Sequence, residues 1–368
     1  MLIEENKPLA PFTTFGIGGP ARWLVEAVSE DEIVEAVAWA LERGVPLFAL
    51  GGGSNLLVSD AGFDGLVLRI GLRGIDAAGT STAGGQWIYK VAAGEDWDRF
   101  VERTVQDGCA GVECLAGIPG TVGGTPVQNV GAYGQEVATS IETVRAFDLE
   151  EQTFVEFGAA DCGFVYRKSR FNSEDRGRYI VTRVDYRVTR GGPPTLVYAD
   201  LKRTILEIYP DRGQPSLAEV AAAVRRVRQS KGMLLVEGDP NCRSAGSFFK
   251  NPVVGEEQVR RISEASGKIP PQFPAGASAS KPGRVKVPAA WLIEQAGFNK
   301  GYRLGAAGIS SRHTLALVNC GTQDGCGDHD GCRGASAAEI LALAGQITAA
   351  VEARFGILLE IEPVMAGF

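Results

Sequence analysis

Two glycine-rich loops constrain this chain more than any other feature of its sequence. The first, at residues 51–56, follows the apolar run at 45–50, which has the length and composition of a buried strand. The second extends over residues 117–134 and combines glycines with Thr, Gln, Asn and Tyr. Glycine has no Cβ, so the backbone N–H groups of such loops can approach a phosphate closely.

The first loop alone is also compatible with a plain turn, because it has neither the dinucleotide fingerprint Gly-x-Gly-x-x-Gly nor the spacing of a phosphate-binding P-loop. The second loop favours a functional interpretation, since few structural turns need so many glycines beside polar side chains. Two such loops in adjacent α/β units are predicted to clasp the pyrophosphate of a dinucleotide between them.

Helix-capping and strand patterns place these loops in separate units. A capping box from Ser29 to Glu32 and a terminal Gly44 predict the first helix. With strands at 45–50 and 65–70 it forms a first α/β unit, residues 1–70. A second α/β unit, residues 71–231, is predicted from the following segments: strands at 86–94, 142–150 and 181–188, and helices at 96–107 and from Ser216 through Val227.

Residues 232–356 are expected to form a third domain, with helices at 256–266, 288–296 and 336–354. Residues 357–368 are expected to be a terminal strand or tail that docks elsewhere. The basic run at 225–231 is interpreted as a solvated helix face, which is the usual role of such runs.

Charge and hydropathy argue against two classes of partner. The 368 residues carry 37 basic and 44 acidic side chains, a net charge of -7, so no nucleic-acid partner is expected. No apolar run reaches the roughly 18–20 residues that span a bilayer, and the N-terminus has no signal-peptide pattern. We therefore expect a soluble, cytoplasmic protein without membrane insertion, and a monomer.

Five sequence blocks, in order, resemble the UDP-N-acetylenolpyruvoylglucosamine reductase (UDP-N-acetylmuramate dehydrogenase) family. The resemblance extends from about Phe12 to about Pro363. The blocks are Thr13–Ala21, Gly51–Asp60, Gly117–Glu136, Tyr166–Phe171 and Ser244–Pro252.

The resemblance implies both a fold and an activity. The implied fold is α+β, with a two-subdomain FAD-binding module of the vanillyl-alcohol-oxidase type and a third α+β domain that binds the substrate. The implied reaction is the NADPH-dependent reduction of UDP-N-acetylglucosamine enolpyruvate to UDP-N-acetylmuramate through non-covalently bound FAD, in peptidoglycan precursor synthesis. NADPH and the substrate would take turns at one site, which explains why NADPH has no glycine motif of its own.

Three residues match the catalytic positions of the family. Ser247 matches the serine that protonates C2 of the enolpyruvyl group after hydride has reached C3, and a serine can do so only if its surroundings stabilise the alkoxide. Arg167 offers a bidentate fork for the substrate carboxylate. Glu362 matches the acidic partner near the chain end. Because this chain reads Glu360-Ile361-Glu362-Pro363 where relatives often read Glu-Pro-Glu-Val, Glu360 remains an alternative.

Further roles are implied residue by residue. Tyr198 matches a tyrosine that closes over the substrate diphosphate in one of the two classes of the family, and its presence implies that class. The expected substrate contacts are Tyr133, Tyr166, Tyr198, Lys231, Lys250, Asn251 and His313. The expected FAD contacts are Gly51, Gly52, Gly53, Ser54, Asn55, Leu56, Ile118, Pro119, Gly120, Thr121, Gly123, Gly124, Gln128, Asn129, Gly131 and Ala132.

The segment from Cys320 to Cys332, with Cys326 and His329, looks like an insertion relative to most relatives. Its C-x5-C-x5-C spacing is not a common zinc pattern, so an exposed loop is favoured and no metal is expected. The chain has seven cysteines, an odd number that favours reduced thiols.

Three other functions are disfavoured. A metal-binding or interaction protein built on the segment from Cys320 to Cys332 would leave the glycine-rich loops unexplained. An oxidase of the same module with histidyl-bound flavin is disfavoured, because the only histidines are His313 and His329, outside the flavin units. A flavin-binding protein without catalysis would not need Ser247, Arg167 and Glu362 together.

Overall fold

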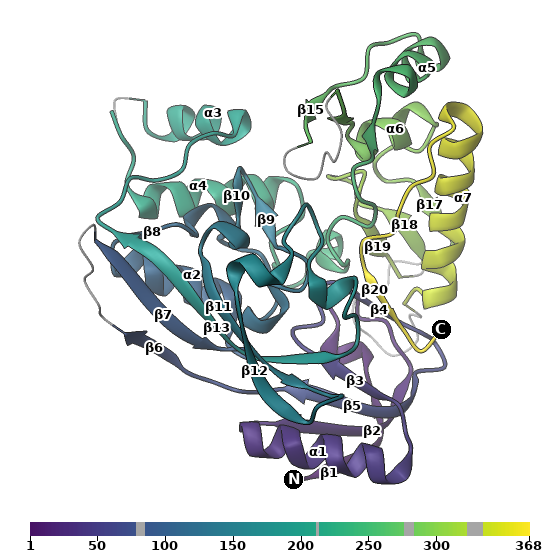
Figure 1. Cartoon of the computed structure of the whole chain (residues 1–368). Helices are drawn as coiled ribbons and strands as arrows, with labels where there is room; N and C mark the ends of the chain where they lie inside the picture. Colours follow the sequence, from purple (N-terminus) through teal and green to yellow (C-terminus); the bar gives the residue numbers. More distant parts are fainter. Residues whose placement is uncertain (79–84, 211–212, 276–282, 322–333) are drawn as a thin grey trace. The chain divides into compact units, whose positions relative to one another are not determined.

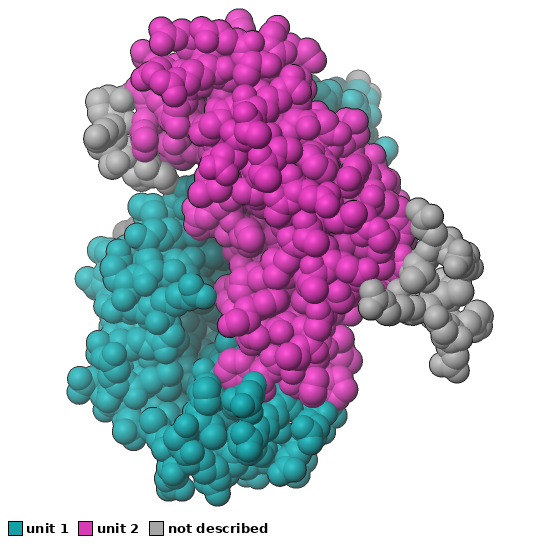
Figure 2. All heavy atoms as spheres, turned by 90° about the vertical axis from the view of Figure 1, so that its right-hand side faces the viewer, with its two compact units in different colours: residues 1–7, 21–52, 64–230 teal, residues 8–20, 53–63, 231–368 magenta. Residues whose placement is uncertain are grey.

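The computed structural model describes residues 1–78, 85–210, 213–275, 283–321 and 334–368 (Figure 1). The chain divides into two compact units, coloured separately in Figure 2. Unit 1 comprises residues 1–7, 21–52 and 64–230, and unit 2 comprises residues 8–20, 53–63 and 231–368. The domain boundaries expected at residues 70, 231 and 356 remain predictions.

The first sheet of unit 1 packs against one helix. Its strand order is β1 (Ile3–Pro8), β2 (Pro20–Ala27), β5 (Phe63–Ile70) and β3 (Leu47–Leu50), with β3 and β5 parallel. Helix α1 (Glu30–Arg43) begins at Ser29, whose hydroxyl accepts from the Glu32 amide, and ends at Gly44 in the left-handed region, as the capping pattern predicted. The apolar face of α1 is buried, and Figure 1 shows the helix lying along this sheet.

The second sheet of unit 1 is antiparallel. Its strand order is β12 (Thr153–Gly158), β11 (Ile141–Asp148), β13 (Tyr179–Arg190), β7 (Gln86–Ala92) and β6 (Ile75–Ala78), and β8 (Cys109–Ala110) pairs with β13. Strands β9 (Gly131–Ala132) and β10 (Gln135–Glu136) form a separate two-stranded antiparallel sheet. The helices of this part are α2 (Trp97–Gln106), α3 (Ala199–Ile208) and α4 (Leu217–Ser230). The predicted strands and the helices at 96–107 and 216–227 are thereby confirmed, whereas α3 is not anticipated by the patterns above.

An ion pair between a buried carboxylate at the end of β11 and a partly exposed arginine makes the stability of unit 1 depend on pH. The Asp148 carboxylate is 2% exposed and accepts from Arg178 Nη2 at 2.7 Å and from the Glu150 amide at 2.9 Å. These hydrogen bonds, that from Arg178 first, hold the pKa of Asp148 below its ordinary value. A lowered folded-state pKa adds stability above the unfolded pKa of about 3.9, and this stability is lost as the pH falls through the folded value.

We therefore expect Asp148→Asn to lower the free energy of unfolding at pH 7 by about 1–3 kcal/mol, because a charged acceptor is lost. The difference between the variant and the parent should shrink as the pH falls below about 4, because the carboxylate of the unfolded parent takes up a proton there before that of the folded parent does. Urea unfolding at several pH values measures this. The control is Asp64→Asn, which removes an exposed partner of Arg22 and should change stability by less than about 0.5 kcal/mol. A difference that is independent of pH would contradict the linkage.

Unit 2 is built around helix α7 (Ala337–Phe355). A capping box of Ser336 and Glu339 begins this helix and Gly356 ends it, as predicted. The Asp60 carboxylate also accepts from the Ala337 amide at 2.7 Å, so the segment 53–63 is fastened to the N-terminus of α7. The other helices are α5 (Glu256–Ser266) and α6 (Ala289–Gln295), close to the expected ranges.

Three small sheets complete unit 2. They are β14 (Val253–Val254), β16 (Val285–Lys286) and β15 (Phe273–Pro274); β17 (Arg303–Leu304), β18 (Ala307–Ile309) and β19 (Leu317–Asn319); and β20 (Val364–Ala366) with β4 (Leu56–Val58). The last pair is parallel, so the C-terminal segment docks on a strand near the N-terminus, as expected for residues 357–368. Within the described ranges, no helix combines the length and hydropathy that crossing a membrane requires.

Candidate functional site

The two predicted glycine loops meet in unit 1. A Cβ on Gly52 would lie 2.6 Å from the Gly120 Cα, and one on Gly51 would lie 2.8 Å from Thr121 Oγ1. The third glycine, Gly53, has φ +62°, and a Cβ there would lie 1.9 Å from the Phe12 carbonyl oxygen within unit 2. A side chain at any of these three positions would therefore clash with a neighbouring segment. The close approach of the two loops fits the expected pyrophosphate cradle of FAD.

We expect Gly52→Ala to lower the FAD content of the purified protein and to reduce the free energy of unfolding by about 1–3 kcal/mol, because backbone atoms of Gly120 block the added methyl group. Flavin absorbance per chain and urea unfolding measure the two effects. Gly345→Ala, at an exposed position of α7 with open space around it, should retain FAD and gain up to about 1 kcal/mol. Full FAD occupancy in Gly52→Ala would exclude the cradle.

Helices α2 and α4 fix the beginning of the second loop. The Gly117 amide donates to Asp98 Oδ1 at 2.6 Å, and the Gly117 carbonyl accepts from Arg228 Nε at 2.9 Å. Arg225 donates to the same Asp98 carboxylate. Arg228 is 7% exposed, and this burial lowers the pKa of its guanidinium, while the nearby Tyr133 and Asp98 favour the charged form. The basic run at 225–231 is thus not simply a solvated face, and that part of the sequence interpretation is wrong.

Three predicted site residues share a strained backbone conformation. Asn129, Tyr133 and Arg167 have φ values of +44°, +49° and +56°, in the left-handed region that residues other than glycine seldom adopt. Such strain persists where the surrounding structure enforces it, and it gathers at functional sites. The Asn129 side chain is buried and bonds to Glu136, to the Val165 carbonyl and to the Ala138 amide, so it holds the loop to the turn that carries Arg167.

Two tyrosines and an arginine lie together beside this turn. The rings of Tyr133 and Tyr198 are edge-to-face at 5.4 Å, and Tyr198 stands at the N-terminus of α3 with 36% of its surface exposed. Burial raises the pKa of Tyr133, and its hydroxyl is hydrogen-bonded to Arg228. Arg167 donates to the Gly131 carbonyl at 3.0 Å, and its guanidinium lies 5.3 Å from the Tyr166 ring centroid.

In unit 2 the predicted serine and the predicted acid lie on neighbouring extended segments. Phe249 forms an antiparallel bridge with Ile361, and the Glu362 amide donates to the Phe248 carbonyl at 2.9 Å. On the other side, the Phe248 amide donates to the Leu315 carbonyl at 2.7 Å. Ser247 and Glu362 are thus joined through one backbone hydrogen bond to the residue that follows Ser247.

The same pairing puts the two candidate carboxylates, Glu360 and Glu362, in different surroundings. The Glu360 carboxylate forms an ion pair with Lys250, and its side chain is 71% exposed. Glu362 lies across from Phe248, two register positions closer to Ser247 than Glu360, and it is half-buried. This favours Glu362 over Glu360 as the residue next to Ser247.

The remaining substrate candidates of unit 2 make local contacts. Asn251 Oδ1 accepts from the Ala289 amide at 2.9 Å at the beginning of α6. His313 Nδ1 accepts from the Leu315 amide at 3.1 Å, which leaves the proton of a neutral imidazole on Nε2. Lys231 is half-buried.

The predicted residues are shared between the units. Unit 1 contains Gly51, Gly52, Ile118, Pro119, Gly120, Thr121, Gly123, Gly124, Gln128, Asn129, Gly131, Ala132, Tyr133, Tyr166, Arg167 and Tyr198. Unit 2 contains Gly53, Ser54, Asn55, Leu56, Lys231, Ser247, Lys250, Asn251, His313 and Glu362.

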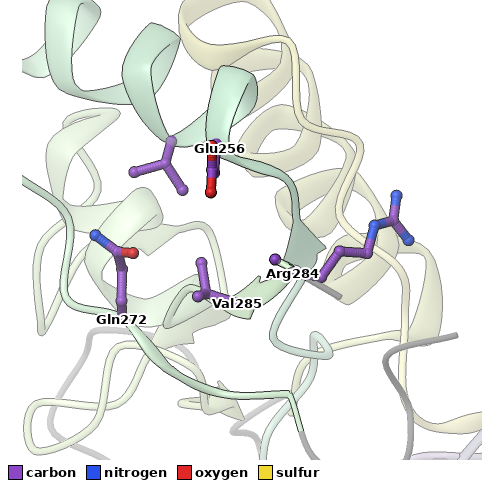
Figure 3. A pocket seen from close by; sticks show the side chains of 6 residues that line it. Glu256, Gln272, Arg284 and Val285 are labelled. Atoms are coloured by element: carbon purple, nitrogen blue, oxygen red, sulfur yellow. The ribbon is translucent and has the colours of Figure 1, made fainter. Parts of the chain in front are cut away.

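Two other features fall outside this set. A surface depression of about 260 Å³ beside α5 and β16 contains none of the predicted residues (Figure 3); it is lined by Glu256, Val259, Gln272, Gly283, Arg284 and Val285. Cys326, His329 and Cys332, in the segment where an exposed loop without a metal is expected, lie outside the described residues. In the part of the chain that the structure describes, no group of three metal-ligating side chains occurs.

Comparison with known proteins agrees with the sequence resemblance. Residues 21–154 match an FAD binding domain family, and residues 239–328 match the C-terminal domain of UDP-N-acetylenolpyruvoylglucosamine reductase. The chain is 45% identical to the UDP-N-acetylenolpyruvoylglucosamine reductase of Streptomyces coelicolor, covering 99% of this chain and 90% of that protein. It is 43% identical to the reductase of Thermobifida fusca, covering 99% and 98%.

A solved structure agrees as well. The crystal structure of the reductase from Thermus caldophilus superimposes with a TM-score of 0.61 and 27% sequence identity, covering 99% of this chain and 98% of that one. The predicted fold class is confirmed: an α+β chain with an FAD-binding module of the vanillyl-alcohol-oxidase type and a distinct C-terminal domain. The chain belongs to the UDP-N-acetylenolpyruvoylglucosamine reductase family, FAD-containing oxidoreductases that use NADPH to reduce UDP-N-acetylglucosamine enolpyruvate in peptidoglycan precursor synthesis.

Proposed function

We propose that Ser247, Arg167 and Glu362 carry out the second half of this reaction, in which the enolpyruvyl group becomes the lactyl group. The observation that carries the proposal is the backbone pairing in unit 2, where the Glu362 amide donates to the Phe248 carbonyl at 2.9 Å. This pairing holds the backbone of Glu362 beside Phe248, the residue that follows Ser247, and it supports the proposal independently of the family resemblance.

Each of the three residues has a separate task. Ser247 gives its proton to C2 of the enolpyruvyl group once hydride has reached C3. Arg167 binds the substrate carboxylate, for which a guanidinium offers two parallel N–H donors. Glu362 stabilises the enolic form by hydrogen bonding, which helps because charge develops on those oxygens in the transition state.

FAD, when bound, supplies hydride transfer between NADPH and the substrate. Gly51 and Gly52 let the first loop approach Gly120 and Thr121 closely, which supports a backbone cradle for its pyrophosphate, and Arg228 holds the Gly117 end of the second loop in place. NADPH and the substrate use one site in turn, so the substrate residues also serve NADPH. Tyr198 closes over the substrate diphosphate. Its exposed position at the N-terminus of α3 and its ring contact with Tyr133 support this class of the family.

The net charge and the chemistry of the substrates support part of the proposed setting of the enzyme. We place it in the cytoplasm as a monomer, with UDP-N-acetylglucosamine enolpyruvate and NADPH as its small-molecule partners, and without a nucleic acid or a membrane. The net charge of -7 supports the exclusion of nucleic acid. The substrate is a charged nucleotide sugar that is made and consumed in water.

An anaerobic two-step spectrum tests the proposal. NADPH added to the purified holoenzyme should bleach the flavin, and UDP-N-acetylglucosamine enolpyruvate added next should restore the oxidised spectrum with formation of the lactyl product. Bleaching that the enolpyruvate fails to reverse would contradict the substrate assignment, while the flavin and NADPH would stand. Light scattering on the same sample measures the mass of the particle, and a dimer would contradict the monomer.

A further inference from the structure

The turn that carries Ser247 is held at both ends. Downstream, Phe248 pairs on one side with Leu315 and on the other with Glu362. Upstream, Ser244 is 6% exposed and its carbonyl accepts a hydrogen bond of 2.6 Å from Thr14 Oγ1. Gly246, between the two ends, has φ +73° and donates its amide to Ser244 Oγ at 3.3 Å. Thr14 is therefore the side chain, 230 positions away in sequence, that fastens the upstream end of the turn.

Thr14 is itself fixed against the first glycine loop. Its amide donates to the Gly53 carbonyl at 3.2 Å. Its hydroxyl has one proton to donate and lies 3.5 Å from the Ser54 carbonyl, against 2.6 Å for the Ser244 carbonyl, so the bond goes to Ser244. The next residue, Phe15, packs edge-to-face against Phe248 at 6.3 Å, and its carbonyl accepts from Asn319 at 3.0 Å.

We propose that Thr14 is a positioning residue for Ser247, a role that rests on the function proposed above for this serine. Through its amide Thr14 takes its position from Gly53 in the loop expected to bind FAD, and through its hydroxyl it sets the Ser244–Ser247 turn. The position of Ser247 then depends on the loop expected to bind FAD as well as on the residues beside Ser247 in the sequence. Placement of this kind matters, since a proton donor about 1 Å out of position costs about 10²-fold in rate.

The test compares Thr14→Val, which removes the hydroxyl at nearly constant shape, with Thr14→Ser, which keeps it. In Thr14→Val we expect FAD content and flavin reduction by NADPH to remain within about twofold of the parent, and reoxidation by the enolpyruvate to slow about 10²-fold. Thr14→Ser should restore most of that rate. Thr13→Val is the matched control, because the Thr13 hydroxyl bonds to Ala10 and Ile17 and not to the serine turn. It should leave reoxidation unchanged.

A double-variant cycle separates positioning from general damage. In a Ser247→Ala background, Thr14→Val should slow reoxidation no further, because the group that it positions is gone. Additive effects, equal slowing of both half-reactions, loss of FAD, or an unchanged rate in Thr14→Val would each overturn the proposal. If Thr14→Val fails to fold, Thr14→Ala answers the same questions. A normal reoxidation rate in Ser247→Ala alone would instead refute the proposed function.

Discussion

Ser247→Ala is expected to slow reoxidation of the reduced flavin by UDP-N-acetylglucosamine enolpyruvate by about 10²- to 10⁴-fold, the range that a positioned proton donor contributes. Reduction of the flavin by NADPH needs no proton from this hydroxyl, so its rate should stay within about twofold. The difference between the two half-reactions distinguishes loss of the donor from loss of the fold, because a damaged flavin site would slow both.

Anaerobic stopped-flow spectra of each half-reaction provide the measurement. Ser263→Ala is a suitable control, since the Ser263 hydroxyl donates to the Val259 carbonyl within α5 and has no place in the proposed mechanism. Its rates should match those of the parent. If Ser247→Ala reoxidised as fast as the parent, the proton would have to come from another group, and the pairing of Phe248 with Glu362 would have no catalytic significance.

Glu362→Gln is expected to slow the same step by about 10²-fold or more, while Glu360→Gln changes it by less than about threefold. The two positions are matched in chemistry and differ in environment. Glu360 forms an ion pair with Lys250, and its side chain is largely exposed, where such a pair contributes little to stability. Glu362 lies across from Phe248, the residue that follows Ser247.

The comparison is informative because both substitutions remove one charge from the same extended segment. Any general effect of charge on substrate affinity should appear in both variants as a similar change in KM. A specific effect on proton transfer should appear in the reoxidation rate of Glu362→Gln alone. If Glu360→Gln were the slower variant, the catalytic carboxylate would have to be reassigned to Glu360.

Sequence patterns predicted the elements that depend on neighbours along the chain. Ser29 and Ser336 cap the helices that their spacing predicted, and Gly44 and Gly356 end them, because capping is a contact over three or four residues. Helix α3 has no side-chain cap at Tyr198, so its beginning lacked the usual signal. The prediction that Arg228 is solvated was wrong. Arg228 lies four residues after Val224 on the buried face of α4, and that spacing indicates burial.

Contacts between segments that are far apart in the sequence could not be predicted from these patterns. The bond from Thr14 to Ser244 and the pairing of β20 with β4 join segments hundreds of residues apart, and neither leaves a periodic trace in the sequence. The roles of Ser247, Arg167 and Glu362 came from the family resemblance. A serine in Gly-Ser-Phe or a glutamate near a chain end would otherwise be taken for an ordinary surface residue.

The interleaving of the two units also bears on how the protein is made. Unit 2 needs residues 8–20 and 53–63, and it also needs residues 231–368, which leave the ribosome much later. At about 5–20 residues per second, the early segments wait for many seconds without their partners. Strand β4, all three residues of which are buried in the folded protein, receives its partner β20 only after residues 364–366 have been synthesised. During that interval Leu56–Val58 has no partner strand, and we expect this apolar edge to be open to pairing with other chains.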